Sequence, residues 1–262
     1  MSHYAWLLAP VIIGVLALVC NIILGRQVLQ RGVVFIDLAM AQISALAMIT
    51  IELYAGFESS LLSKVLASYL LTLPAAGVLI FIERRAIAHL EALIGLLYVI
   101  AACLAVNVVS VQAHGKELID SLLNGRLLWA DERDVRYVAL VTLILLWVQF
   151  QRRRWLTGPA FYILFALAVP PLVINLGVYL EFAALIMPAL FALLFKPRRY
   201  WWASLGLGLL GGGGGFLLSL YWDYPVGPSV VIIMAVLAMV GMALRQITLC
   251  LSVRTESPPL DK

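Results

Sequence analysis

Few side chains in this sequence have the chemistry to bind or move an ion, and the most conspicuous of them stands inside a long apolar run. Asp37 lies in the run Val33–Leu53, where helical spacing places Ser44 on the same face. A carboxylate at membrane depth costs free energy, so it is by default a candidate for a site that passes a cation. The alternative is structural, with Asp37 capping its helix or pairing with Arg31.

Three uncharged polar residues also fall within apolar runs and extend this candidate path. They are Gln42, Asn107 and Asn175. Hydrogen bonds between helices are the simpler interpretation of each, and lining a translocation path is the functional one. With Asp37 and Ser44 they make up the set that we expect along such a path.

A second group of candidate ligands lies in the longest polar stretch, residues 114–136. His114, Glu117 and Asp120 have helical spacing, which predicts a shared face. Histidine and carboxylate groups are suitable ligands for zinc or manganese, although a solvated helix at the membrane surface explains the same pattern. Asp223, just before the last apolar run, is the fourth candidate for ion binding on the outer side. The sequence does not identify the metal.

The motifs of several enzyme classes are missing, which narrows the function. There is no GxxxxGK[ST] phosphate loop, so we do not expect the chain to hydrolyse ATP itself. HExxH and GxSxG are also absent, and the 3 cysteines have neither disulfide nor metal-ligand spacing. We therefore expect no catalytic residues and no cofactor in this chain.

Composition shows which kind of element must hold these side chains. Of the 262 residues, 64% are hydrophobic and only 12% are charged, too few charges for the surface of a soluble domain. The apolar runs are long enough to cross a bilayer, so we predict an all-α, polytopic transmembrane bundle of about nine helices. The expected spans are Trp6–Leu24, Val33–Leu53, Val65–Ile82, Ala92–Val111, Tyr137–Phe150, Pro159–Leu176, Phe182–Phe195, Trp201–Leu220 and Gly227–Leu244.

The basic residues set the orientation of these spans. With the N-terminus outside, 13 of the 18 basic residues fall in inner segments. The outer segments hold only Lys64, Lys116, Arg126, Arg133 and Arg136. This excess is the positive-inside pattern, so we predict an outer N-terminus and a cytoplasmic C-terminus. One membrane domain would cover residues 1–250, followed by a cytoplasmic tail at 251–262, and the basic clusters indicate topology rather than nucleic-acid binding.

Glycine and proline mark places where helix packing changes. Between Gly208 and Gly215 glycines recur four residues apart, with Gly212 among them, a spacing that lets helix backbones approach closely. A flexible helix that lines a pathway is the alternative. Prolines predict kinked interior helices whose freed carbonyl groups need partners from neighbouring helices. These prolines are Pro170, Pro171 and Pro188.

Four stretches resemble the permease subunits of the zinc, manganese and iron ABC importers. Arg31–Ala47 is similar to the second-helix region of that family, although Gln42 stands where many members have a nearby histidine. Leu176–Leu194 resembles its glycine-to-proline pattern, and Tyr221–Ile232 resembles its turn before the last helix. Leu118–Val135 resembles an external loop of the family, and the four stretches occur in the family's order.

This resemblance implies a multi-pass protein of the bacterial inner membrane that imports a divalent transition metal ion. It implies a homodimer with the translocation path at the dimer interface. A separate ATPase subunit would bind ATP and contact the inner face, and an extracytoplasmic metal-binding protein would deliver the ion. Zinc, manganese and iron remain equal alternatives.

One departure from the family concerns coupling to the ATPase. Typical members carry an additional cytoplasmic stretch between the fifth and sixth spans, whereas Gln151–Pro159 here runs almost directly into the next helix. We therefore expect the inner loop at 83–91 to form a short surface helix and carry the coupling, with an ordinary solvated turn as the alternative. Its candidates for polar contacts are Glu83, Arg84, Arg85 and Glu91.

Two other function classes stay open at this point. A secondary transporter or channel without an ATPase would use Asp37 as an ion or proton relay, and the missing coupling stretch favours it. A membrane assembly factor would carry no substrate flux at all. Copurification with an ATPase separates the first from an ABC permease, and flux measurements in vesicles separate the second.

Overall fold

The computed structural model describes residues 7–55, 61–85, 89–110 and 115–255. Within these ranges the chain is helical, without strands, which confirms the all-α prediction. The helices are α1 (Leu8–Arg31), α2 (Ile36–Ala55), α3 (Leu61–Arg84), α4 (Leu90–Ser110), α5 (Gly115–Asn124), the 3-10 helix η2 (Leu127–Trp129), α6 (Glu132–Gln151), α7 (Arg153–Thr157), α8 (Ala160–Leu193), the 3-10 helix η3 (Pro197–Arg199), α9 (Tyr200–Trp222) and α10 (Val226–Thr255). Helix α10 thus continues beyond residue 250, where we expected the tail to begin.

Eight of the described helices are long and apolar enough to cross a membrane. The difference from about nine arises in α8, which joins two of the predicted spans. Its backbone leaves helical geometry at Gly177, with φ 78° and ψ 161°. The predicted spans Pro159–Leu176 and Phe182–Phe195 correspond to the two segments on either side of this residue.

The contacts of α1 show that the two segments of α8 run in opposite directions. The first segment begins beside the C-terminal end of α1, where Arg31 donates a hydrogen bond to the oxygen of Gly158 at 2.7 Å. In the second segment Glu181 lies beside Asn21, and the Leu185 oxygen lies against Gly25. The second segment therefore runs parallel to α1 and returns toward the end at which α8 began.

Gly177 makes this reversal possible. Its positive φ disfavours residues with a Cβ atom, and a Cβ here would lie 2.3 Å from the nitrogen of Gly125. Next to it, the nitrogen of Arg126 donates a hydrogen bond to the oxygen of Asn175 at 3.0 Å. The turn between α5 and η2 is thus attached to the reversal point of α8.

The prolines of α8 do not interrupt its helical backbone geometry. The only non-helical residue within α8 is Gly177, and carbonyl groups that the prolines free have found partners. The Thr72 hydroxyl donates to the oxygen of Ala166 at 3.4 Å, four residues before Pro170. The Tyr69 hydroxyl donates to the oxygen of Leu167 at 3.0 Å, four residues before Pro171. Helix α3 therefore supplies the hydrogen bonds that the sequence predicted neighbours must supply.

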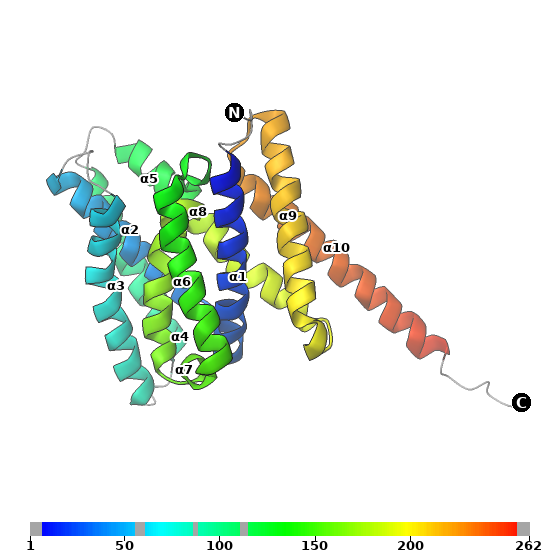
Figure 1. The fold of residues 1–262 in the computed structure, drawn as a ribbon. Coiled ribbons are helices and arrows are strands. Elements are labelled where there is room, and N and C mark those ends of the chain that lie inside the picture. Colours follow the sequence, from blue (N-terminus) through cyan, green and yellow to red (C-terminus); the bar gives the residue numbers. More distant parts are fainter. Residues whose placement is uncertain (1–6, 56–60, 86–88, 111–114, 256–262) are drawn as a thin grey trace, which may run out of the picture.

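Helix α8 is the centre of the bundle (Figure 1). In its most apolar stretch 83% of the residues are buried, against 22% in α4. Helices α1, α2, α3, α6, α9 and α10 pack around it, and the outer faces of α3, α4, α6, α9 and α10 expose leucine, valine and isoleucine side chains. Such a surface is suited to lipid rather than water.

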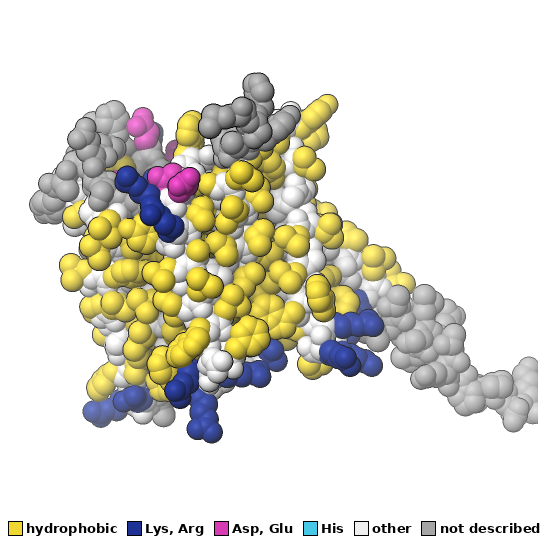
Figure 2. Space-filling view, in the orientation of Figure 1, with side chains coloured by type: hydrophobic (Ala, Val, Ile, Leu, Met, Phe, Trp, Pro, Cys, Tyr) yellow, Lys and Arg dark blue, Asp and Glu magenta, His cyan; other side chains and the backbone are white. Residues whose placement is uncertain are grey.

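The charged residues lie at the two ends of this apolar band. Figure 2 shows lysine and arginine side chains gathered at the end where α7 lies, and acidic side chains at the opposite end. The basic end includes Arg84, Arg153 and Arg199, from inner segments of the predicted topology. The distribution agrees with the predicted charge asymmetry, while the direction of the bundle in a membrane stays a prediction.

Candidate functional site

A buried polar cluster joins three helices in the apolar interior. It consists of Asn21 of α1, Asp37 of α2 and Glu181 of α8, each with 0% of its surface exposed. The Asn21 Nδ2 atom donates a hydrogen bond to Glu181 Oε2 at 3.1 Å. Both Asp37 oxygens, Glu181 Oε1 and Asn21 Oδ1 have no hydrogen-bond partner among the described residues. The two carboxyl groups are close enough for their charges to interact.

Local backbone geometry brings these side chains together. Helix α1 ends at Gly32, whose φ of 67° forms a left-handed cap that donates to the oxygen of Val28. The chain turns back at once, so Asp37 falls in the first turn of α2, where the helix dipole favours a negative charge. Glu181 follows the Gly177 reversal by about one helical turn.

The cluster has the side chains of a cation-binding site, and none of its three members is basic. Neither Asp37 nor Glu181 forms an ion pair within the described chain. Two buried carboxylates are not stable as unpaired charges, so protons or a bound cation must neutralise them. Carboxylate and amide oxygens suit divalent cations such as manganese. The cluster holds two acids, and the described residues contain no group of three or more His, Cys, Asp or Glu that could hold a metal.

The structural alternative for Asp37 was a helix cap or a pair with Arg31. Asp37 is buried, and both of its oxygens lack a hydrogen-bond partner among the described residues, so it does neither. Arg31 instead binds Glu83 at 2.6 Å. The sequence did not reveal Glu181 and Asn21 as partners of Asp37. The predicted spans leave Glu181 in an outer turn, and Asn21 is the single polar residue in the otherwise apolar predicted span Trp6–Leu24.

The other predicted path residues lie on α2, α4 and α8 and differ in burial. Ser44 is buried on α2, with its hydroxyl unpartnered among the described residues. Asn175 is buried in α8, where its Nδ2 atom donates to the oxygen of Pro171 at 2.8 Å. Gln42 is half-buried. Asn107 is exposed on α4, and its place along a translocation path stays a prediction.

The candidate ligands on the outer side are spread over the surface. Glu117 and Asp120 lie on α5, and both are exposed. Asp223 is exposed at the C-terminal cap of α9. His114 lies outside the described residues. The one tight acidic arrangement found at this end of the described chain is structural, because Asp134 binds Arg126 at 2.7 Å and helps Asp131 to cap α6. The backbone N–H of Asp134 holds the pKa of Asp131 below its ordinary value.

On the basic end, the acidic residues of the 83–91 loop bind within the protomer. Glu83 accepts hydrogen bonds from Arg31 and from the Tyr162 hydroxyl, the latter at 3.2 Å. Glu91 accepts a hydrogen bond from the nitrogen of Phe35 at 3.0 Å. The two arginines that follow Glu83, Arg84 and Arg85, are exposed. Residues 86–88 lie outside the described chain, so the predicted surface helix is not tested, but Glu83 and Arg84 belong to α3 itself.

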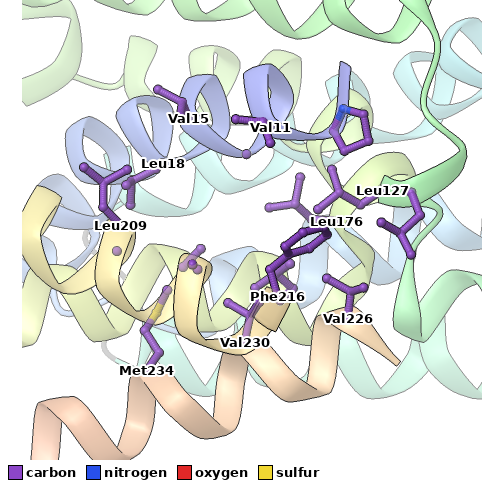
Figure 3. A pocket seen from close by; sticks show the side chains of 18 residues that line it. Val11, Val15, Leu18, Leu127, Leu176, Leu209, Phe216, Val226, Val230 and Met234 are labelled. Atoms are coloured by element: carbon purple, nitrogen blue, oxygen red, sulfur yellow. The ribbon is translucent and has the colours of Figure 1, made fainter. Parts of the chain in front are cut away.

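A cavity of about 270 Å³ lies between α1, α8, α9 and α10, apart from the polar cluster. Figure 3 shows Val11, Val15 and Leu18 of α1 on one side of this cavity and Phe216 and Met234 on the other. All of its lining residues are apolar or glycine. It therefore offers a cation no side-chain ligands, and the polar cluster is the better candidate site.

Comparisons with known proteins give the chain its family. A comparison with curated proteins finds no match. Among solved structures, PsaBC from Streptococcus pneumoniae in complex with Fab superposes with a TM-score of 0.72 over 91% of each chain, at 17% sequence identity, and so shares the fold. The model of the ABC 3 transport family matches residues 3–161 and 156–245. These two matches meet near the short segment Gln151–Pro159. The predicted resemblance is confirmed, and the chain belongs to the ABC 3 transport family.

Proposed function

We propose that this chain is the membrane-spanning permease of an ABC importer for a divalent transition metal ion, driven by a separate ATPase subunit. The observation that carries the proposal is the pair of buried carboxyl groups, Asp37 and Glu181, in a chain of this family. Membership of the family supports the ABC permease, and the carboxyl pair supports a cationic substrate. Zinc, manganese and iron stay open as substrates, and a bacterial inner membrane is the expected location.

Two copies of the chain would make the working permease, with the path between them. The acidic side chains Glu117, Asp120 and Asp223 would then face the extracytoplasmic metal-binding protein, where they would attract a cation. To reach the buried cluster, the ion would have to leave this interface and enter the interior of one protomer, because the cluster has no exposed surface in the described chain. Because the cluster carries only two acids and one amide, it would hold the ion weakly, as a path requires.

Coupling to the ATPase would run through Arg31. Its guanidinium binds Glu83 at the end of α3 and the oxygen of Gly158 behind α7, so the 83–91 loop and α7 are joined. Arg31 also lies over the ring of Phe161, 4.8 Å from its centre. A push on either inner segment would therefore move α1, α3 and the start of α8 as one body.

The test is reconstitution of the chain with its cognate ATPase subunit, followed by uptake of zinc, manganese and iron ions into vesicles. We expect uptake of at least one ion that requires ATP. The double variant Arg84→Glu/Arg85→Glu should abolish that uptake if the exposed arginines dock on the ATPase, provided that membrane insertion is unchanged. Uptake that never depends on ATP would overturn the proposal.

A secondary transporter without an ATPase is the second candidate. One observation favours it, the five-residue α7 that occupies the place of the family's coupling segment. In that case Asp37 and Glu181 would exchange protons for the transported cation. Uptake driven by a pH gradient in vesicles without an ATPase would select this alternative.

A further inference from the structure

An open recess of about 490 Å³ lies at the basic end of the bundle, where α8 and η3 meet α10. It is lined by Phe195, Lys196 and Arg199 on one side and by Leu244 and Arg245 on the other. This recess shares no residue with the Asp37–Glu181 cluster and plays no part in the function proposed above.

Most of the residues that line the recess are basic. Three of the five carry a positive charge, and the helical segments that form it, residues 182–222 and 226–255, contain no aspartate or glutamate. Like charges repel one another, so Lys196 and Arg199, which lie on the same side of the recess, are stabilised when an anion lies beside them. Basic residues placed only as topology signals would have no need to converge.

The position of the recess favours an anion that carries an apolar part. Arg245 lies with its guanidinium over the Phe195 ring, 5.2 Å from the ring centre, which holds a cation beside an apolar surface. Leu193, Trp202 and Leu244 are exposed nearby in sequence. Figure 2 shows basic side chains directly below the apolar band where α9 begins and α10 passes.

We propose that this recess binds the phosphate headgroup of an anionic phospholipid, with the acyl chains along the exposed faces of α9 and α10. Basic pockets between transmembrane helices on the cytoplasmic side are suited to such headgroups. Lys196 and Arg199 contact the phosphate, and Arg245 closes the recess from α10. A free phosphate ion lacks the apolar part that Phe195 and Leu244 in the lining would contact.

The experiment measures lipid binding to the full-length chain purified in detergent. Native mass spectrometry gives its affinity for phosphatidylglycerol, which is anionic, and for phosphatidylcholine, which is zwitterionic. The variant is Lys196→Gln/Arg199→Gln. The matched control is Arg153→Gln/Arg154→Gln, which also removes two exposed cations from the basic end but outside the recess.

We expect the wild-type chain and the control to prefer phosphatidylglycerol. Each cation near the phosphate should contribute about a five-fold preference, so the recess variant should lose roughly 25-fold. Equal binding of the two lipids by the wild type would overturn the proposal, as would equal losses in the control and the recess variant. Competition by inorganic phosphate as strong as by phosphatidylglycerol would assign the recess to a free anion instead. Loss of the preference on dimerisation would assign it to a second copy of the chain.

Discussion

The Tyr69 hydroxyl of α3 donates a hydrogen bond to the main-chain oxygen of Leu167 in α8, at 3.0 Å. In a regular helix that oxygen would accept from the residue four positions later, which here is Pro171 and has no N–H to give. One turn along α3, the Thr72 hydroxyl lies 3.4 Å from the oxygen of Ala166, four residues before Pro170, and makes its shorter hydrogen bond, at 2.9 Å, with the Ser68 oxygen of its own helix. Tyr69 thus replaces a backbone donor of α8, with a weaker contribution from Thr72, and the central helix crosses its prolines without a break.

Removing the Tyr69 hydroxyl should therefore destabilise the bundle. In Tyr69→Phe the Leu167 oxygen loses its partner in an apolar interior, and we expect a loss of about 1 kcal/mol in unfolding free energy. Thermal unfolding in detergent measures it, with Tyr179→Phe, an exposed tyrosine on α8, as the control. The second variant Tyr69→Phe/Pro171→Ala restores a backbone donor and should recover the loss. If Tyr69→Phe unfolds like the wild type, the hydroxyl does not replace the proline's missing N–H.

The glycines of α9 divide into two kinds, which the sequence did not distinguish. A Cβ atom at Gly215 would lie 2.3 Å from the Cα of Val230, and one at Gly211 would lie 2.6 Å from a side-chain atom of Met234. At Gly212 nothing lies within 4 Å, because this residue lines the apolar cavity. The predicted close packing is confirmed for Gly211 and Gly215 and is wrong for Gly212.

Substitution of these glycines should separate the two kinds. Gly215→Ala pushes α9 away from α10 and should cost roughly 1–3 kcal/mol of stability. Gly212→Ala adds the same methyl group to open space and should leave the unfolding temperature unchanged or raise it. The comparison of the two variants by thermal unfolding needs no further control, because the chemical change is identical. Similar unfolding temperatures would show that α9 and α10 do not pack as closely as described.

The orientation of the bundle follows from the basic residues and can be checked directly. Of the described loops, the one after α5 should face outside and the one before η3 should face the cytoplasm. Alkaline phosphatase fused after Asn124 should be active, and the same enzyme fused after Phe195 should be inactive. A green fluorescent protein at the same two sites should give the opposite pattern. Active phosphatase at both sites would contradict the predicted topology.

The sequence predicted the helices well because each one must match the thickness of the bilayer. Long apolar runs separated by basic clusters leave little choice of length or type. It predicted a turn between the spans that end at Leu176 and begin at Phe182, but not that this turn is attached by contacts with Gly125, which is distant along the chain. Side chains from distant helices meet only after such a turn is known. For this reason Asp37 was found as a candidate, but its partners Asn21 and Glu181 were not.

The last prediction concerns the two buried carboxyl groups. If Asp37 and Glu181 pass a cation, the neutral variants Asp37→Asn and Glu181→Gln should each lower metal uptake at unchanged protein levels, because each removes an oxygen ligand that carries charge. The same variants should unfold at the same or a higher temperature, since an amide avoids the cost of burying a charge. The amide oxygen that Glu181→Gln introduces can still accept the hydrogen bond from Asn21.

Uptake of radioactive manganese or zinc ions into vesicles, together with thermal unfolding, measures both effects. Glu132→Gln, which removes an exposed carboxylate at the start of α6 and outside the candidate sites, serves as the matched control and should leave uptake unchanged. Normal uptake in the double variant Asp37→Asn/Glu181→Gln would mean that the cluster only packs the interior, and the path of the ion would have to lie elsewhere.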